Sequence, residues 1–223
     1  MKYPLNTYKK MKNIGLIILV FVTLYACNSD DYLVDGGISD ENVNATTFDF
    51  IKSHKQLDTL AILIEKAGMT TEVNGENTLF APNNTSIKLY VNKVLEVMRN
   101  EDPQAQFTVN DIHVDTLKKY MGGFIFPGKI KRENMTKEGE VLTALNGEER
   151  RISLEPTDNY SGQLETFPEY VYFTYKVGDD WEAWDDGNSD DKKYLIRTSN
   201  ISTTNGVVHV LQGSYVLFNY DPK

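Results

Sequence analysis

The chain has 223 residues, enough for one domain of ordinary size, and its 40% hydrophobic and 11% aromatic residues exclude a disordered composition. The formal net charge is −9, but residues 1–26 hold four lysines and no acid, so the remaining residues carry a charge of −13. An acidic body without any block of Lys or Arg argues against nucleic-acid binding and against electrostatic docking on anionic lipid.

Residues 1–26 have the pattern of a secretory signal peptide. A basic start is followed by an apolar run, residues 14–24. This run fits the apolar core of a signal peptide and is shorter than the ~20 residues that a membrane-spanning helix needs. It ends in Leu-Tyr-Ala-Cys27, which resembles the lipobox of bacterial lipoproteins. The resemblance implies cleavage before Cys27 and a lipid on its sulfur, and the alternative is a chance cysteine after an ordinary signal peptide.

Residues 27–45 are expected to form a lipid-bearing, flexible tether, because residues 32–44 are rich in Gly, Asp and Asn and show no periodicity. Ser29, Asp30 and Asp31 directly follow the lipid site and resemble the surface-export signal of some Gram-negative lipoproteins; the alternative is a merely solvated tether. Cys27 is the only cysteine. The body therefore has no internal disulfide, and its core must stabilise it.

The first half of the body is predicted to be mainly helical. Thr46 or Thr47 can cap a short helix, and apolar residues at i, i+3, i+4 and i+7 predict a helix over 57–67 that ends at Gly68. Ser86 can cap a further helix, and Asp115 a short one over 116–120. The apolar face predicted for the helix after Ser86 consists of Ile87, Tyr90, Val91, Val94, Leu95 and Met98.

The second half favours strands. The run 78–81 is predicted to be a buried strand stopped by Pro82, and from Gly122 a period of two fits better than a helical period. The predicted strands are 124–126, 141–145, 151–154, 170–175, 194–197 and 207–218. Without alternation of strands and helices in this half, we expect an α+β fold with an antiparallel sheet.

Two segments resemble those of fasciclin-type (FAS1) domains: Asn-Thr-Leu-Phe-Ala-Pro-Asn-Asn-Thr at 77–85 and Asn-Gly-Val-Val-His-Val-Leu-Gln at 205–212. Residues 117–128 and the strand pair at 141–154 match the family in the right order between them. The resemblance implies a FAS1-like fold, with N-terminal helices packed on a mainly antiparallel β-sheet wedge. It also implies a non-catalytic role in adhesion.

The chain departs from the family in three places. Tyr120-Met121 stands where the family has a Tyr-His pair associated with integrin-linked adhesion in animal members, so adhesion through that pair is in doubt. Residues 157–193 form an insertion in the single domain expected over 46–220, and 100–113 are longer than in a compact member. Only five residues follow Phe218, so we expect no second repeat.

Catalysis is not expected. His54, His113 and His209 share no metal-ligand spacing, and His209 is predicted to make a structural hydrogen bond within a strand. The chain shows no glycine-flanked serine nucleophile and no phosphate-binding glycine loop. We therefore predict no enzyme, no cofactor and no metal.

Both tryptophans, Trp181 and Trp184, lie in one segment, 178–191, which has seven acids and no base. Such a segment should be solvated. Its indoles either contact a partner, a protein or a sugar ring, or pack back on the core. A calcium loop is a third option, although 185–188 lacks the alternating Asp-x-Asp-x-Asp-Gly pattern.

The function expected from the sequence is that of a lipid-anchored outer-membrane protein on the cell surface, serving adhesion or partner binding. The rival hypothesis keeps the fold and changes the role. It makes the chain an accessory glycan-binding lipoprotein of an outer-membrane polysaccharide-uptake system. The fold alone does not choose between the two.

Overall fold

The computed structural model describes residues 41–157 and 167–219, so Cys27, Ser29, Asp30 and Asp31 lie outside the described residues. The helices come first: α2 (Thr47–Ser53), α3 (Asp58–Ala67), α4 (Thr70–Val73), α5 (Asn84–Glu101) and α6 (Val114–Met121). The strands are β1 (Asn77–Ala81), β2 (Ile125–Pro127), β3 (Glu140–Thr143), β4 (Glu149–Pro156), β5 (Glu169–Tyr175), β6 (Lys192–Ser202) and β7 (Val207–Leu211). No helix in the described part of the chain is long and apolar enough to cross a membrane.

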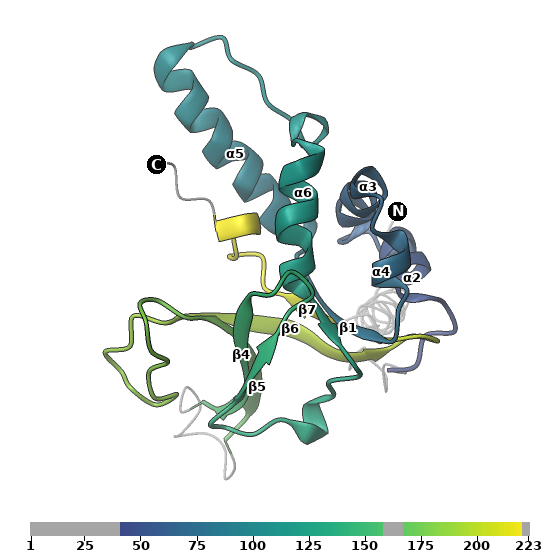
Figure 1. Ribbon diagram of the computed structural model, residues 1–223, viewed down its shortest axis with the longest axis vertical. Coiled ribbons are helices and arrows are strands. Elements are labelled where there is room, and N and C mark those ends of the chain that lie inside the picture. The colour runs from purple at the N-terminus through teal and green to yellow at the C-terminus, as the bar shows by residue number, and fades with distance from the viewer. Residues whose placement is uncertain (1–40, 158–166, 220–223) are drawn as a thin grey trace, which may run out of the picture. The chain divides into compact units, whose positions relative to one another are not determined.

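The strands form one sheet in the order β2-β1-β7-β6-β5-β4-β3, and the helices lie together on one side of it (Figure 1). Every neighbouring pair is antiparallel except β1 and β7, which run parallel with Phe80 opposite His209. The α+β class and the mainly antiparallel sheet are therefore confirmed. The two segments that resemble the FAS1 family contain this parallel pair.

The core is one cluster of buried side chains from the helices and the sheet, and it includes Phe80, which has no exposed surface. Its ring lies 4.9 Å from the ring of His209, 5.1 Å from that of Phe173 and 5.4 Å from that of Phe126, measured between centroids. All four rings belong to strands, and β1 and β7 are buried at nearly every position, so both faces of these two strands are covered.

Two predicted helix caps are wrong. The side chain of Asn83, not Ser86, caps α5 by accepting the Ser86 N–H at 3.0 Å. His113, not Asp115, caps α6, and its Nδ1 accepts the Asp115 N–H at 3.3 Å. A cap accepts from the amide two or three residues ahead, so both predicted residues are the donors of the bond.

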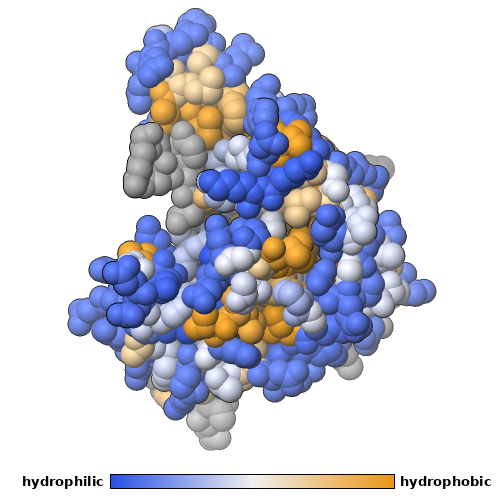
Figure 2. Space-filling view, in the orientation of Figure 1, coloured by the Kyte–Doolittle hydropathy of each residue, from blue (hydrophilic) through white to orange (hydrophobic). Residues whose placement is uncertain are grey.

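The predicted apolar face of α5 is buried only near its start. Ile87 and Tyr90 are buried, whereas Met98 is 39% exposed. An 18-residue helix is about 27 Å long, and α5 runs away from the sheet so that its last turns have little to pack against (Figure 1). Apolar side chains accordingly gather on the visible surface of α5 (Figure 2).

The last predicted strand is too long. β7 ends at Leu211, and the chain then turns into a short 3₁₀ helix, Leu217–Asn219. Phe218 has a left-handed backbone, with φ of 64°, and its ring contacts the rings of Tyr90 and Tyr120 at 5.2 and 5.5 Å. Periodicity alone could not show this turn, because the apolar residues continue beyond it.

Candidate functional site

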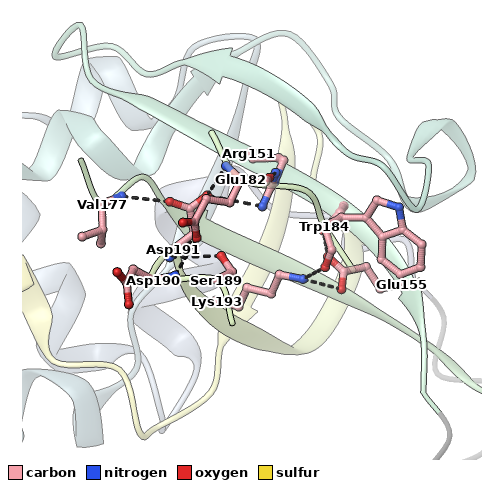
Figure 3. A network of polar contacts seen from close by, with 10 residues as sticks. Arg151, Glu155, Val177, Glu182, Trp184, Ser189, Asp190, Asp191 and Lys193 are labelled. Atoms are coloured by element: carbon pink, nitrogen blue, oxygen red, sulfur yellow. Dashed lines mark hydrogen bonds and ion pairs between the residues drawn. The ribbon is translucent and has the colours of Figure 1, made fainter. Parts of the chain in front are cut away.

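The tryptophan loop, residues 178–191, connects β5 to β6 and contains both tryptophans. Both indole side chains are half-buried. The loop is held against β4 by a network of polar contacts from Arg151, Glu182, Asp191 and Lys193 (Figure 3).

Asp191 organises the end of the loop from a fully buried side chain. Its Oδ1 accepts the Val177 N–H at 2.9 Å, and its Oδ2 accepts the Glu182 N–H at 3.2 Å. The guanidinium of Arg151, only 6% exposed, lies 3.5 Å from Oδ2. The expectation of a solvated segment is therefore wrong for Asp191. Its charge is compensated by one cation and two amides, as a buried carboxylate requires.

Glu182 links the start of the tryptophan loop to its end. Its Oε2 accepts the Asp190 N–H at 2.5 Å and the Asp191 N–H at 3.4 Å, and its own carbonyl accepts from Arg151. The Ser189 hydroxyl holds the pKa of Glu182 below its usual value, and the two amides act in the same direction. Two of the seven acids of the tryptophan loop thus build its structure.

Trp181 lies against two cations. The Arg151 guanidinium is 5.3 Å from its ring centroid, and the Lys176 ammonium is 5.9 Å away, both within the range of cation–π attraction. Its indole nitrogen is buried and has no hydrogen-bond partner among residues 41–157 and 167–219. Of the two alternatives, Trp181 follows the second, because its indole packs back on the domain.

Trp184 is held by its backbone instead. Its carbonyl accepts from Lys193, whose ammonium also contacts Glu155 at 2.9 Å. The indole extends beyond Glu155, away from the Arg151–Asp191 pair (Figure 3), and the only cation near its ring is Lys137 at 5.7 Å, among the residues described. A rigid backbone with a half-buried indole is a suitable contact for a partner.

The calcium option finds no support in the geometry. Asp185 and Asp186 are exposed, and Asp186 accepts the Asn188 N–H at 2.9 Å, which makes a local turn. Across the described ranges, no group of three or more His, Cys, Asp or Glu side chains is placed to hold a metal ion.

Each of the three histidines has a structural place of its own. His54 and His113 stand beside helix ends, and His209 is fully buried on β7. The Nδ1 of His209 accepts the Asn200 N–H at 3.4 Å, so the ring is neutral and its Nε2–H donates to the Ile130 carbonyl at 2.8 Å. The structural hydrogen bond predicted for His209 is confirmed. Burial lowers its pKa to about 4.

We expect His209 to make the domain acid-sensitive. The unfolded chain takes up a proton near pH 6.5, whereas the folded chain does so only near pH 4. The contribution of neutral His209 to the free energy of unfolding is therefore fully present above pH 6.5. It is lost as the pH falls from 6.5 to 4, by about 3 kcal/mol in total. Urea unfolding of the wild type and of His209→Gln measures this. The stability difference between them should shrink toward pH 4, and a constant difference would contradict the assignment.

The fasciclin domain family model matches residues 55–214, most of the chain, and the chain belongs to this family. Among solved structures, the chain is similar to the FAS1 domain pair of the insect cell adhesion molecule fasciclin I, with 13% identity and a TM-score of 0.48. That match covers 78% of this chain and 51% of the other, so the chain spans about half of that structure. No curated protein matches it. FAS1 domains are generally non-catalytic and associated with adhesion.

The Tyr120-Met121 position explains one departure from the family. Met121 is buried in the core, 1% exposed, and the Tyr120 ring packs on Phe218. A buried thioether offers no donor or acceptor of the kind that a histidine supplies. This position therefore contributes packing to the domain.

Proposed function

We propose that the chain is a lipid-anchored protein of the outer membrane, displayed on the cell surface, whose FAS1 domain binds a partner without catalysis. The observation that carries this proposal is the preformed tryptophan loop on a domain of the fasciclin family. Because Asp191 and Glu182 already order the loop, a partner that covers Trp184 does not have to order it on binding.

The membrane anchor in this proposal is a lipid on Cys27, with Ser29, Asp30 and Asp31 directing export. It rests on the apolar run and the lipobox-like residues before Cys27. Several acyl chains hold a protein stably where one chain is marginal, at ~0.8 kcal/mol per buried methylene.

Replacing Cys27 tests the anchor. Cys27→Ala should abolish labelling by a radioactive fatty acid, because the chain has no second cysteine to take the lipid. The full chain should then appear unprocessed or in the soluble fraction. The matched control is Ser29→Ala, which should keep the label. Labelling that persists in Cys27→Ala would rule out the lipoprotein assignment.

The alternative function is glycan binding in a polysaccharide-uptake system. The feature that favours it is the half-buried indole of Trp184, because indole faces stack on sugar rings. An array of immobilised glycans, probed with the full chain, separates the two functions. Strong signals that vanish in Trp184→Ala would support glycan binding. An array without signal would contradict glycan binding and favour adhesion to a protein partner.

A further inference from the structure

A cleft of about 470 Å³ lies where the two family segments end, after β1 and after β7. Its size is within the ~300–1,000 Å³ of small-ligand sites. It shares no residue with the tryptophan loop. Polar side chains dominate its lining, with amides and hydroxyls from Gln56, Asn84, Thr85, Gln212 and Ser214.

The floor of this polar cleft is rigid because two asparagines hold three segments together. Asn83, only 7% exposed, donates from its Nδ2 to the Leu211 carbonyl at 3.2 Å while its Oδ1 caps α5. Asn84 accepts the Thr59 N–H at 3.2 Å and donates from Nδ2 to the Lys55 carbonyl at 3.1 Å. The two asparagines of the lining are thus held in place before any ligand arrives.

The polar cleft is also positively charged within an acidic body. Lys55 and Arg197 line it, and no acidic side chain does. Within the described ranges neither cation forms an ion pair, whereas many other Lys and Arg side chains do. The nearby Asp58 is bound to the side chain of Asn84 at 2.7 Å and to the Thr59 N–H at 2.8 Å. The lining itself therefore holds two cations and no acid, which favours an anionic ligand.

We propose that the polar cleft binds an acidic saccharide, with a uronate carboxylate contacting Lys55 and Arg197. Amide and hydroxyl side chains both donate and accept, which suits the hydroxyls of a sugar ring. An acidic peptide fits less well, because no apolar side chain lines the cleft to receive its side chains. Asn83 itself caps the first turn of α5, so the cations, not the helix end, supply the charge. The proposal goes beyond the function of the tryptophan loop and does not depend on it.

Calorimetric titration of the full chain in detergent tests this proposal, with tetragalacturonate as the probe and neutral maltotetraose beside it. We expect binding of tetragalacturonate only, weakening as salt is raised. The double variant Lys55→Gln/Arg197→Gln should bind about tenfold more weakly, since two exposed charge contacts contribute up to ~1 kcal/mol each. Its melting temperature should stay unchanged, because neither cation pairs with a described residue.

The matched control is Lys93→Gln/Lys118→Gln, which removes the same charge from exposed positions outside the cleft. This control should bind tetragalacturonate like the wild type. If it loses as much affinity as the cleft variant, the loss reflects net charge alone, and the proposed site is contradicted. Two further results would also overturn the proposal: no binding of tetragalacturonate by the wild type, or equal binding of tetraglutamate. Trp184→Ala should leave this titration unchanged, which keeps it separate from the tryptophan loop.

Discussion

Phe80→Ala should bring the domain close to unfolding. Truncating a fully buried phenylalanine costs about 3–5 kcal/mol, and a typical domain has about 5–15 kcal/mol in total. The cost should be near the upper end here, because Phe80 contacts the rings of Phe126, Phe173 and His209. These rings belong to three different strands, so the cavity cannot close by the movement of one side chain.

Urea unfolding of the full chain measures this loss. Phe167→Ala is the matched control, because the Phe167 side chain is 52% exposed and its truncation should change stability by less than about 1 kcal/mol. A loss below about 1 kcal/mol in Phe80→Ala would mean that this ring is not in the core. The pairing of β1 with β7 would then be wrong as well.

Asp191→Asn should be the most damaging change in the tryptophan loop. It removes the charge that compensates Arg151, and breaking one side of a buried ion pair costs about 3–5 kcal/mol. The neutral amide also places an NH₂ group where the carboxylate accepts from Val177 or Glu182. The loop should lose its order before the rest of the domain unfolds.

Two measurements test this expectation. Thermal unfolding of Asp191→Asn should show a lower melting temperature, and the fluorescence of Trp181 should shift to the red as its ring leaves Arg151. Asp185→Asn is the control, an exposed acid of the same loop, with an effect within about 0.5 kcal/mol. In a double-mutant cycle with Arg151→Gln, the two losses should not add. Additive losses would show that Arg151 and Asp191 do not interact.

Much of the fold follows from local patterns. The 3.6-residue period and Gly68 predict α3 and its end, where Gly68 has φ of 69°. The period of two predicts the strands after Gly122. The parallel pairing of β1 with β7 is different, since these strands are more than a hundred residues apart and nothing local records their contact. The resemblance to the family identified both segments, and the structure shows why they occur together.

The candidate site was predictable only in part. The clustering of Trp181 and Trp184 in an acidic segment is visible in the sequence, but the partner of that segment is not. Arg151 lies on β4, 40 positions before Asp191 at the end of the loop, and reaches it because β4 and β6 flank β5 in the sheet. The sequence held one signal, an arginine in the predicted strand 151–154, because a cation that a strand buries requires an anion.

Binding by the Trp184→Ala variant tests the central claim most directly. The probe is a panel of immobilised neutral glycans and extracellular-matrix proteins exposed to the full chain, with the melting temperature measured alongside. We predict that Trp184→Ala weakens the wild-type signal by at least about 30-fold, as expected for a contact worth 2 kcal/mol or more, and leaves the melting temperature unchanged. The control Leu145→Ala removes a side chain that is 49% exposed outside the loop and should keep the signal. Full binding by Trp184→Ala, or a loss that tracks a lower melting temperature, would contradict the account.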